Sequence, residues 1–62
     1  MTEIELWRKG AEARRAGKSL RLGAEELGLT HRDHDERKAF RSGWIDMEKF
    51  MFMSDLIERQ IP

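Results

Sequence analysis

Residues 9–19 read KGAEARRAGKS and residues 37–44 read RKAFRSGW, and these two stretches decide the fold. Each is rich in helix-forming residues and carries glycine within the helical pattern. Glycine lets two helices approach closely, and aromatic side chains nearby supply large, rigid contact area. The stretches therefore predict two helices that pack against each other through a structural core of Trp7, Gly10, Ala13, Gly17, Phe40, Gly43, Trp44 and Met47.

The first helix is predicted over about residues 3–16. Thr2 followed three residues later by Glu5 forms a capping box, which marks the start of a helix. Gly17 is placed to end the helix in the left-handed conformation. Apolar residues at spacings of three and four predict the buried stripe, with smaller residues beside it: Ile4, Trp7 and Ala11, flanked by Leu6, Gly10 and Ala13.

Residues 17–30 are predicted to form an ordered connector with a short helix. Residues 24–27 read AEEL, a good helix former, and Gly28 ends this helix after one or two turns. Thr30, with Asp33 three residues later, is predicted to cap a long helix over about residues 31–59. A stripe at steps of four, three and four runs along it: Phe40, Trp44, Met47 and Met51.

The expected fold is all-α, with two principal helices and a short helical connector. Residues 1–62 form one small helical hairpin or bundle, which we expect dimerisation to complete. A chain of 62 residues buries only about 60% of the surface of its unfolded form, so its stability is marginal. Because the chain has no cysteine, disulfides cannot supplement that stability, and tight packing or self-association is expected instead.

The sequence favours a soluble, cytoplasmic protein without a membrane partner. No apolar run approaches the roughly 18 residues that cross a bilayer. The N-terminal residues also lack the basic and apolar regions of a signal peptide.

The segment FMFM at residues 50–53 is apolar around the whole circumference of a helix. A single packing face cannot bury four consecutive positions, so part of the segment is expected to face a partner, most simply a second copy of the chain. The alternative is that the C-terminal tail folds back and covers the segment. The predicted partner or dimer interface consists of Phe50, Met51, Phe52, Met53, Leu56 and Ile57.

The charge of the chain is balanced overall but unevenly distributed. Twelve basic and twelve acidic residues give a formal net charge of zero. Between Trp7 and Leu22, however, six basic residues and one acid give +5, whereas residues 44–62 carry −2. A local basic face on a neutral protein can bind phosphates, and the alternative is an ordinary solvated helix face. The candidate RNA-binding residues are Arg14, Arg15, Lys18, Arg21, Arg37, Lys38 and Arg41.

The two stretches resemble the two halves of the ribosome modulation factor family. Residues typical of the family pattern stand at Lys9, Gly10, Ala13, Gly17, Lys18 and Ser19, and again at Arg37, Phe40, Gly43 and Trp44. The matching blocks cover 19 of the 62 residues. The resemblance implies a small regulatory protein that binds ribosomal RNA or the ribosome, modulates translation and takes part in ribosome hibernation.

Two other binding functions remain open. A small helical module of the phage or mobile-element type could bind and inhibit a host protein through its apolar segment and acidic tail. A DNA-binding helix-turn-helix is suggested by residues 24–30, AEELGLT, although His34 occupies a position where the second helix needs an apolar residue.

Catalysis is not expected. The chain has no cysteine, no phosphate-cradling glycine loop and no serine placed for activation by histidine, and its length leaves little room for a cavity. His31 and His34 could share a helix face, but zinc needs further ligands that the sequence does not supply. No metal and no cofactor are therefore expected.

Overall fold

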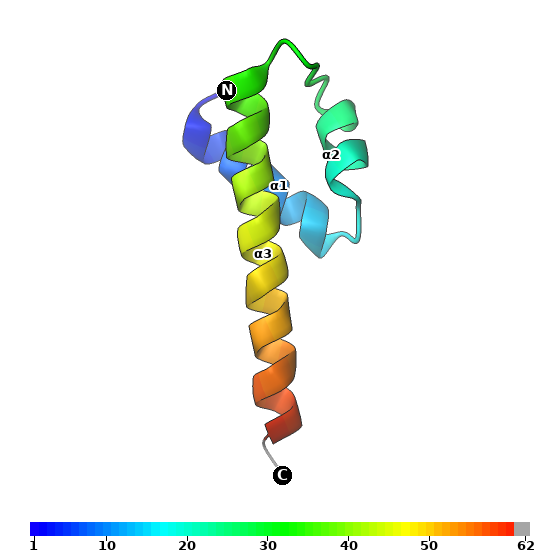
Figure 1. The fold of residues 1–62 in the computed structure, drawn as a ribbon, viewed down its shortest axis with the longest axis vertical. Coiled ribbons are helices and arrows are strands. Elements are labelled where there is room, and N and C mark those ends of the chain that lie inside the picture. Colours follow the sequence, from blue (N-terminus) through cyan, green and yellow to red (C-terminus); the bar gives the residue numbers. More distant parts are fainter. Residues whose placement is uncertain (61–62) are drawn as a thin grey trace.

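A computed structural model describes residues 1–60 of the chain, with side chains described up to Arg59. Its three helices are α1 (Glu3–Arg15), α2 (Leu20–Glu26) and α3 (His34–Gln60), as Figure 1 shows. The described residues contain no strand. This confirms an all-α protein with two principal helices and a short helical connector. Residues 61 and 62, part of the predicted domain, lie outside the described residues.

Local sequence signals determine both ends of α1. The hydroxyl of Thr2 accepts a hydrogen bond from the backbone N–H of Glu5 (3.2 Å), so the predicted N-cap is confirmed. At the other end Gly17 adopts a φ of 80°. The backbone N–H of Gly17 donates to Arg14, and that of Lys18 donates to Ala13, which is the Schellman pattern of a helix C-terminus.

α2 starts earlier than the sequence indicated. The Ser19 hydroxyl accepts a hydrogen bond from the Leu22 backbone N–H (3.1 Å) and caps the helix, which begins at Leu20, four residues before the AEEL segment. Gly28 ends the helix as predicted, with a φ of 74° and a second Schellman pattern. Leu29, which follows it, packs against the core. The connector is therefore a short helix with specific caps at both ends.

The long helix starts at His34 and not at His31 as predicted. The Asp33 carboxylate accepts hydrogen bonds from the backbone N–H (2.8 Å) and hydroxyl of Thr30. The Thr30 hydroxyl accepts one from the Arg32 backbone N–H (3.2 Å). These side-chain bonds close a turn over residues 30–33, and α3 follows, with its first backbone hydrogen bond from Arg37 to the Asp33 carbonyl.

α1 and α3 cross at two glycines, one on each helix. A Cβ atom on Gly10 would collide with the Phe40 carbonyl oxygen and lie 2.9 Å from the Trp44 backbone nitrogen. A Cβ atom on Gly43 would collide with the carbonyl oxygen of Trp7. Each glycine therefore lies directly against the backbone of the other helix, and only a residue without a side chain fits at either position.

Alanines, one leucine and one phenylalanine form the buried core. Among the described residues, Phe40 is the largest fully buried side chain, with 1% of its surface exposed. It packs against Ala13 of α1 and Ala24 of α2, so it links all three helices. The other buried apolar residues are Leu6, Ala11 and Ala39.

The predicted apolar stripe of α1 is wrong in two positions. Ile4 is 70% exposed and Trp7 is 43% exposed, although Trp7 was expected in the core. The helix buries Leu6, Gly10, Ala11 and Ala13, and the close crossing at Gly10 favours small side chains next to it. Trp7 reaches α3 by its indole N–H, which donates to the Asp46 carboxylate (2.9 Å).

The second half of α3 extends beyond the other two helices. In Figure 1, α1 and α2 lie beside the first half of α3, and the turns coloured yellow to red continue alone toward the C-terminus. The molecule measures 48 × 19 × 13 Å along its principal axes. Within the described residues, no helix is both long enough and apolar enough for a transmembrane segment.

Replacing Gly10 by alanine should destabilise the protein by about 3 kcal/mol or more, because the added methyl group overlaps the Phe40 backbone. Helix propensity alone favours the opposite, a gain of about 1 kcal/mol. Chemical denaturation followed by circular dichroism measures the change. Ser42→Ala, at an exposed position next to Gly43, is the control and should stay within about 0.5 kcal/mol of the wild type. Equal stability of Gly10→Ala and wild type would contradict the close crossing.

The pKa of Asp33 lies below its ordinary value, chiefly because of the Thr30 backbone N–H and then the Thr30 hydroxyl. A lowered folded-state pKa means that this turn is stabilised above the unfolded-state pKa and loses the contribution as pH falls through the folded-state pKa. Thr30→Val removes the hydroxyl and should raise the pKa of Asp33, measured by NMR titration of its carboxyl carbon. Thr2→Val removes the equivalent hydroxyl at α1 and should leave that titration unchanged. An unaltered Asp33 titration in Thr30→Val would disprove the role of the hydroxyl.

Candidate functional site

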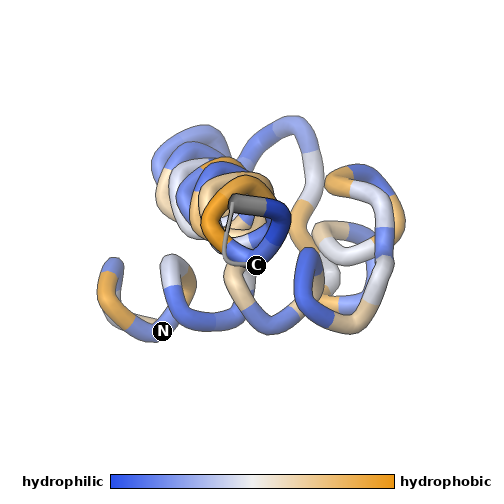
Figure 2. Tube along the Cα trace, turned by 90° about the horizontal axis from the view of Figure 1, so that it is seen from below, coloured by the Kyte–Doolittle hydropathy of each residue, from blue (hydrophilic) through white to orange (hydrophobic). Residues whose placement is uncertain are grey.

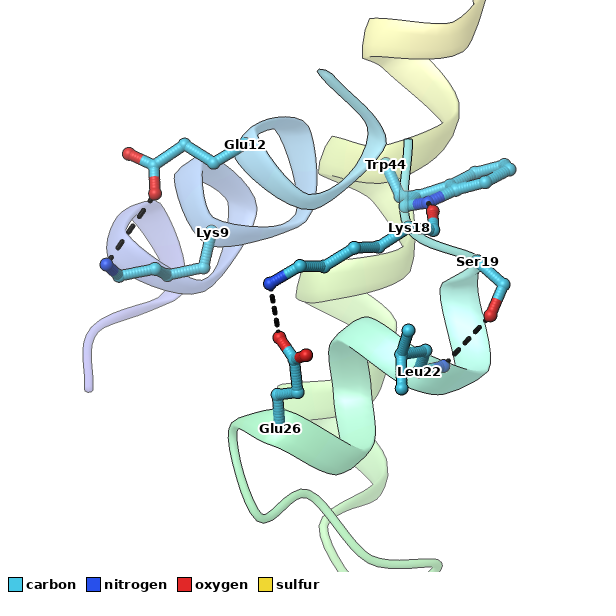
Figure 3. Close-up of polar contacts among 7 residues, drawn as sticks. All are labelled: Lys9, Glu12, Lys18, Ser19, Leu22, Glu26 and Trp44. Atoms are coloured by element: carbon cyan, nitrogen blue, oxygen red, sulfur yellow. Dashed lines mark hydrogen bonds and ion pairs between the residues drawn. The ribbon is translucent and has the colours of Figure 1, made fainter. Parts of the chain in front are cut away.

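Trp44 lies at the centre of the most distinctive polar arrangement in the molecule. Its half-buried ring packs against the core cluster around Phe40. Its indole N–H donates a hydrogen bond to the backbone carbonyl of Lys18 (2.9 Å), as Figure 3 shows. Since Lys18 lies in the turn between α1 and α2, this bond ties the turn to α3. Trp44 therefore joins the two stretches that decided the fold in the sequence.

One arginine side chain lies over the Trp44 ring, and two others share its helix face. The Arg14 guanidinium carbon lies 5.6 Å from the ring centroid, within the range of a cation–π contact. Arg37 and Arg41 precede Trp44 by seven and three residues, so they lie on the same face of α3. Both are exposed. We call this surface the basic side and define it as Arg14, Arg37 and Arg41 with Trp44. Arg15, next to Arg14 along the chain, is also exposed.

Two of the predicted RNA-binding residues are engaged with acidic side chains. The Lys18 ammonium forms an ion pair with Glu26, and the Arg21 guanidinium pairs with Glu25 at 3.2 Å. Exposed pairs of this kind contribute about 0–1 kcal/mol to stability, yet they reduce the positive potential around each base. The positive charge between Trp7 and Leu22 is therefore partly neutralised by acids of α2.

Lys38 borders a different part of the molecule from Trp44. It lines a hollow beside the start of α1, together with Glu3 and Leu6. Of the seven predicted RNA-binding residues, Arg14 lies over the Trp44 ring, Arg37 and Arg41 share a helix face with Trp44 by their spacing, and Lys38 borders the hollow beside α1.

An open hollow of about 350 Å³ lies between α1 and α2. Its walls include Phe40 and Leu27, and charged side chains surround its edge (Figure 3): Lys9, Glu12, Lys18 and Glu26. These charges compensate each other in two ion pairs, Lys9 with Glu12 at 3.6 Å and Lys18 with Glu26. Sequence reasoning missed the hollow because it depends on how the turn at residues 16–19 places α2 beside α1.

Neither histidine belongs to a metal-binding cluster in the described part of the chain. No three His, Asp or Glu side chains there lie together in an arrangement that could hold an ion. The Asp33 carboxylate is directed to Thr30 instead.

A second surface is the apolar C-terminal half of α3. We call residues 50–57 the apolar arm. Figure 2, which looks along α3 from its C-terminal end, shows these hydrophobic turns in the foreground. Phe50, Phe52, Met53, Leu56 and Ile57 are exposed, and Met51 is half-buried. The predicted interface residues thus lie together at one end of the molecule, and the tail does not fold back over them within the described residues.

The spacing of α2 and α3 differs from that of a helix-turn-helix motif. Seven residues, 27–33, separate the two helices, whereas that motif joins its helices by a turn of about three or four residues. The geometry therefore gives no support to sequence-specific DNA binding by α3.

Comparisons of the chain with protein-family models, with curated proteins and with solved structures found no match. The functional interpretation consequently depends on the chemistry of the two surfaces and on the motif resemblance.

Replacing Trp44 by phenylalanine should destabilise the protein by about 1–2 kcal/mol, because the Lys18 carbonyl loses its hydrogen-bond donor in a half-buried position. Trp7→Phe is a matched control, since it also removes one indole hydrogen bond between α1 and α3 but at an exposed position. That variant should change the stability by about 0.5 kcal/mol or less. Urea denaturation followed by circular dichroism compares the two variants. Equal losses of stability would show that the Trp44 hydrogen bond contributes no more than the Trp7 hydrogen bond.

Proposed function

We propose that this is a small, non-enzymatic regulatory protein that binds ribosomal RNA, and through it the ribosome, to modulate translation. The basic side is the proposed contact surface. The observation that carries the proposal is the Arg14 guanidinium over the half-buried Trp44 ring, on the face of α3 that also presents Arg37 and Arg41.

This combination suits RNA better than a flat cationic surface would. Proteins recognise unpaired RNA bases by stacking them on aromatic rings or on arginine planes, and they bind the flanking phosphates with basic side chains. Arg14 is held near a ring by its contact with Trp44, so less side-chain freedom is lost when it binds. Arg37 and Arg41 lie one helical turn apart and can contact neighbouring phosphates.

The resemblance to ribosome modulation factors supports the choice of target. The residues that carry it lie at the helix crossing and around the Trp44 bond: Gly10 against Phe40, Gly43 against Trp7, and Trp44 with Lys18. Those contacts position Arg14 beside α3. The motif and the basic side are thus parts of one arrangement.

The balanced net charge leads to a specific expectation about how binding strength depends on salt. With no overall positive charge, long-range attraction to nucleic acid is small, and affinity depends on the few arginines at the contact. Binding should therefore weaken as salt rises, with a modest slope that reflects the small number of phosphates bound.

The test is co-sedimentation of the purified protein with bacterial ribosomes, and in parallel with protein-free ribosomal RNA, over a range of salt. The double variant Arg37→Gln/Arg41→Gln should bind at least about tenfold more weakly than the wild type. Its plot of log affinity against log salt should be shallower by about 2, because each lost phosphate contact lowers the slope by about 1.

The matched control is Lys49→Gln/Arg59→Gln, which removes the same charge from the same helix outside the basic side. It should bind like the wild type. Failure of the wild-type protein to sediment with ribosomes or RNA at every salt concentration would overturn the proposal. Equal losses in the two double variants would show that only total charge matters, and would overturn the assignment of the basic side.

A further inference from the structure

Arg14 is the only one of the eight arginines in the chain that is not exposed. It is half-buried in the last turn of α1, and its guanidinium lies over the Trp44 ring. A long cationic side chain ordinarily stays in water and loses rotamer freedom when it is held in one place. The position of Arg14 is therefore a specific feature of the tertiary structure.

No carboxylate accounts for the position of Arg14. Among the described residues, the ion pairs join other basic residues to acids: Lys9 with Glu12, Lys18 with Glu26 and Arg21 with Glu25. Arg14 contacts an aromatic ring instead. A ring does not accept the guanidinium N–H donors as a carboxylate does, so these donors stay available to a ligand.

The helix dipole does not account for the position of Arg14 either. A cation is favoured in the last turn of a helix, and both Arg14 and Arg15 stand in the last turn of α1. Arg15 meets this preference while it is exposed. The placement of Arg14 over Trp44 therefore has a different cause.

Trp44 supports Arg14 and is not itself placed to receive a base. Its ring packs against the core cluster around Phe40, and its indole N–H donates to the Lys18 carbonyl. An outward movement of the ring would break the bond to the turn before α2. The group that this arrangement offers to a ligand is the Arg14 guanidinium.

We propose that Arg14 is the base-stacking residue of the basic side. An unpaired base of single-stranded RNA stacks on the side of the Arg14 guanidinium away from Trp44, and Arg37 and Arg41 bind the phosphates next to it. This inference rests on the proposed function. It adds the kind of RNA that the site accepts and the residue that selects it.

The chemistry of arginine suits this role. The guanidinium is planar and weakly hydrated, so it stacks on the π face of a base, whereas the compact, strongly hydrated ammonium of lysine does not. Bases inside a duplex are stacked on their neighbours, and side chains cannot read them in the narrow major groove of A-form RNA. Only an unpaired base can therefore reach Arg14.

Arg37 and Arg41 differ from Arg14 in a way that suits phosphate binding. Both are exposed on α3, so their side chains can follow the RNA backbone and form charge-assisted hydrogen bonds with it. Phosphate contacts position a protein on nucleic acid but do not report on the bases. The choice of unpaired RNA consequently falls to Arg14.

Binding of three RNAs tests the proposal: a mixed-sequence single strand of about eight nucleotides, the same strand with every base replaced by an abasic site, and a duplex of the same length. Fluorescence anisotropy of the labelled RNA measures each affinity. The wild-type protein should bind the normal strand about fivefold or more tightly than the abasic strand. That fold-change corresponds to the lower end of measured stacking contributions.

Arg14→Lys keeps the charge but removes the planar group. It should lose the preference for the normal strand over the abasic strand, and it should bind the abasic strand and the duplex like the wild type. Its dependence on salt should stay the same, because the charge is unchanged. Arg15→Lys is the matched control, since it makes the same substitution at the adjacent exposed residue. This variant should keep the full preference for bases.

The outcomes separate this inference from the proposed function. Equal binding of the normal and abasic strands by the wild type would overturn the inference alone, and so would an Arg14→Lys variant that keeps the preference for bases. Equal losses of Arg14→Lys on all three RNAs would show a structural role only and would also overturn it. Circular dichroism checks that both variants are folded. A wild type that binds none of these RNAs and no ribosomes would overturn the proposed function, and the inference with it.

Discussion

The close crossing of α1 and α3 at Gly10 and Gly43 is the contact on which the rest of the structure depends. Each glycine lies against the backbone of the opposite helix, so the two helix axes approach more closely than side chains elsewhere would permit. At that distance alanines are large enough to fill the space between the helices, and Ala11, Ala13 and Ala39 are indeed buried. Phe40 and Leu6 are the larger side chains buried in the described part of this core. With so little apolar volume available, the backbone contact itself has to supply much of the packing.

The same crossing determines the arrangement of the basic side. It brings the end of α1 next to Trp44, where the indole can reach the Lys18 carbonyl and the ring can accept Arg14. The hydrogen bond holds the turn that leads into α2, and α2 in turn covers Phe40 with Ala24. Trp44 therefore supports the fold and also carries the proposed binding surface. A binding surface built on such a contact is rigid where it matters for recognition, although the protein as a whole is small.

Sequence reasoning succeeded at most sites whose determinants are local, although it missed the cap at Ser19 and the turn over residues 30–33. The Thr2 cap and the terminating glycines Gly17 and Gly28 depend on a few neighbouring residues, and the three helices follow from them. It failed where the outcome depends on tertiary contacts. Hydropathy assigned Ile4 and Trp7 to the buried face because it weights large side chains, whereas a glycine crossing buries small ones. The ion pair between Lys18 and Glu26, eight residues apart, likewise depends on the turn before α2. Counting charges along the sequence therefore could not show that Lys18 is neutralised.

The apolar arm raises a question of helix stability as well as of binding. Isolated helical segments shorter than about 12–15 residues are marginal in water, because few hydrogen bonds offset the loss of backbone freedom. The upper half of α3 is stabilised by α1 and α2, but the turns after Met47 receive no such support within the described residues. A helix packed along Phe50 and Ile57 would provide it, and would at the same time remove apolar surface from water. Folding of the arm and binding of such a helix would then be two aspects of one equilibrium, because the helix would stabilise the same segment that it covers.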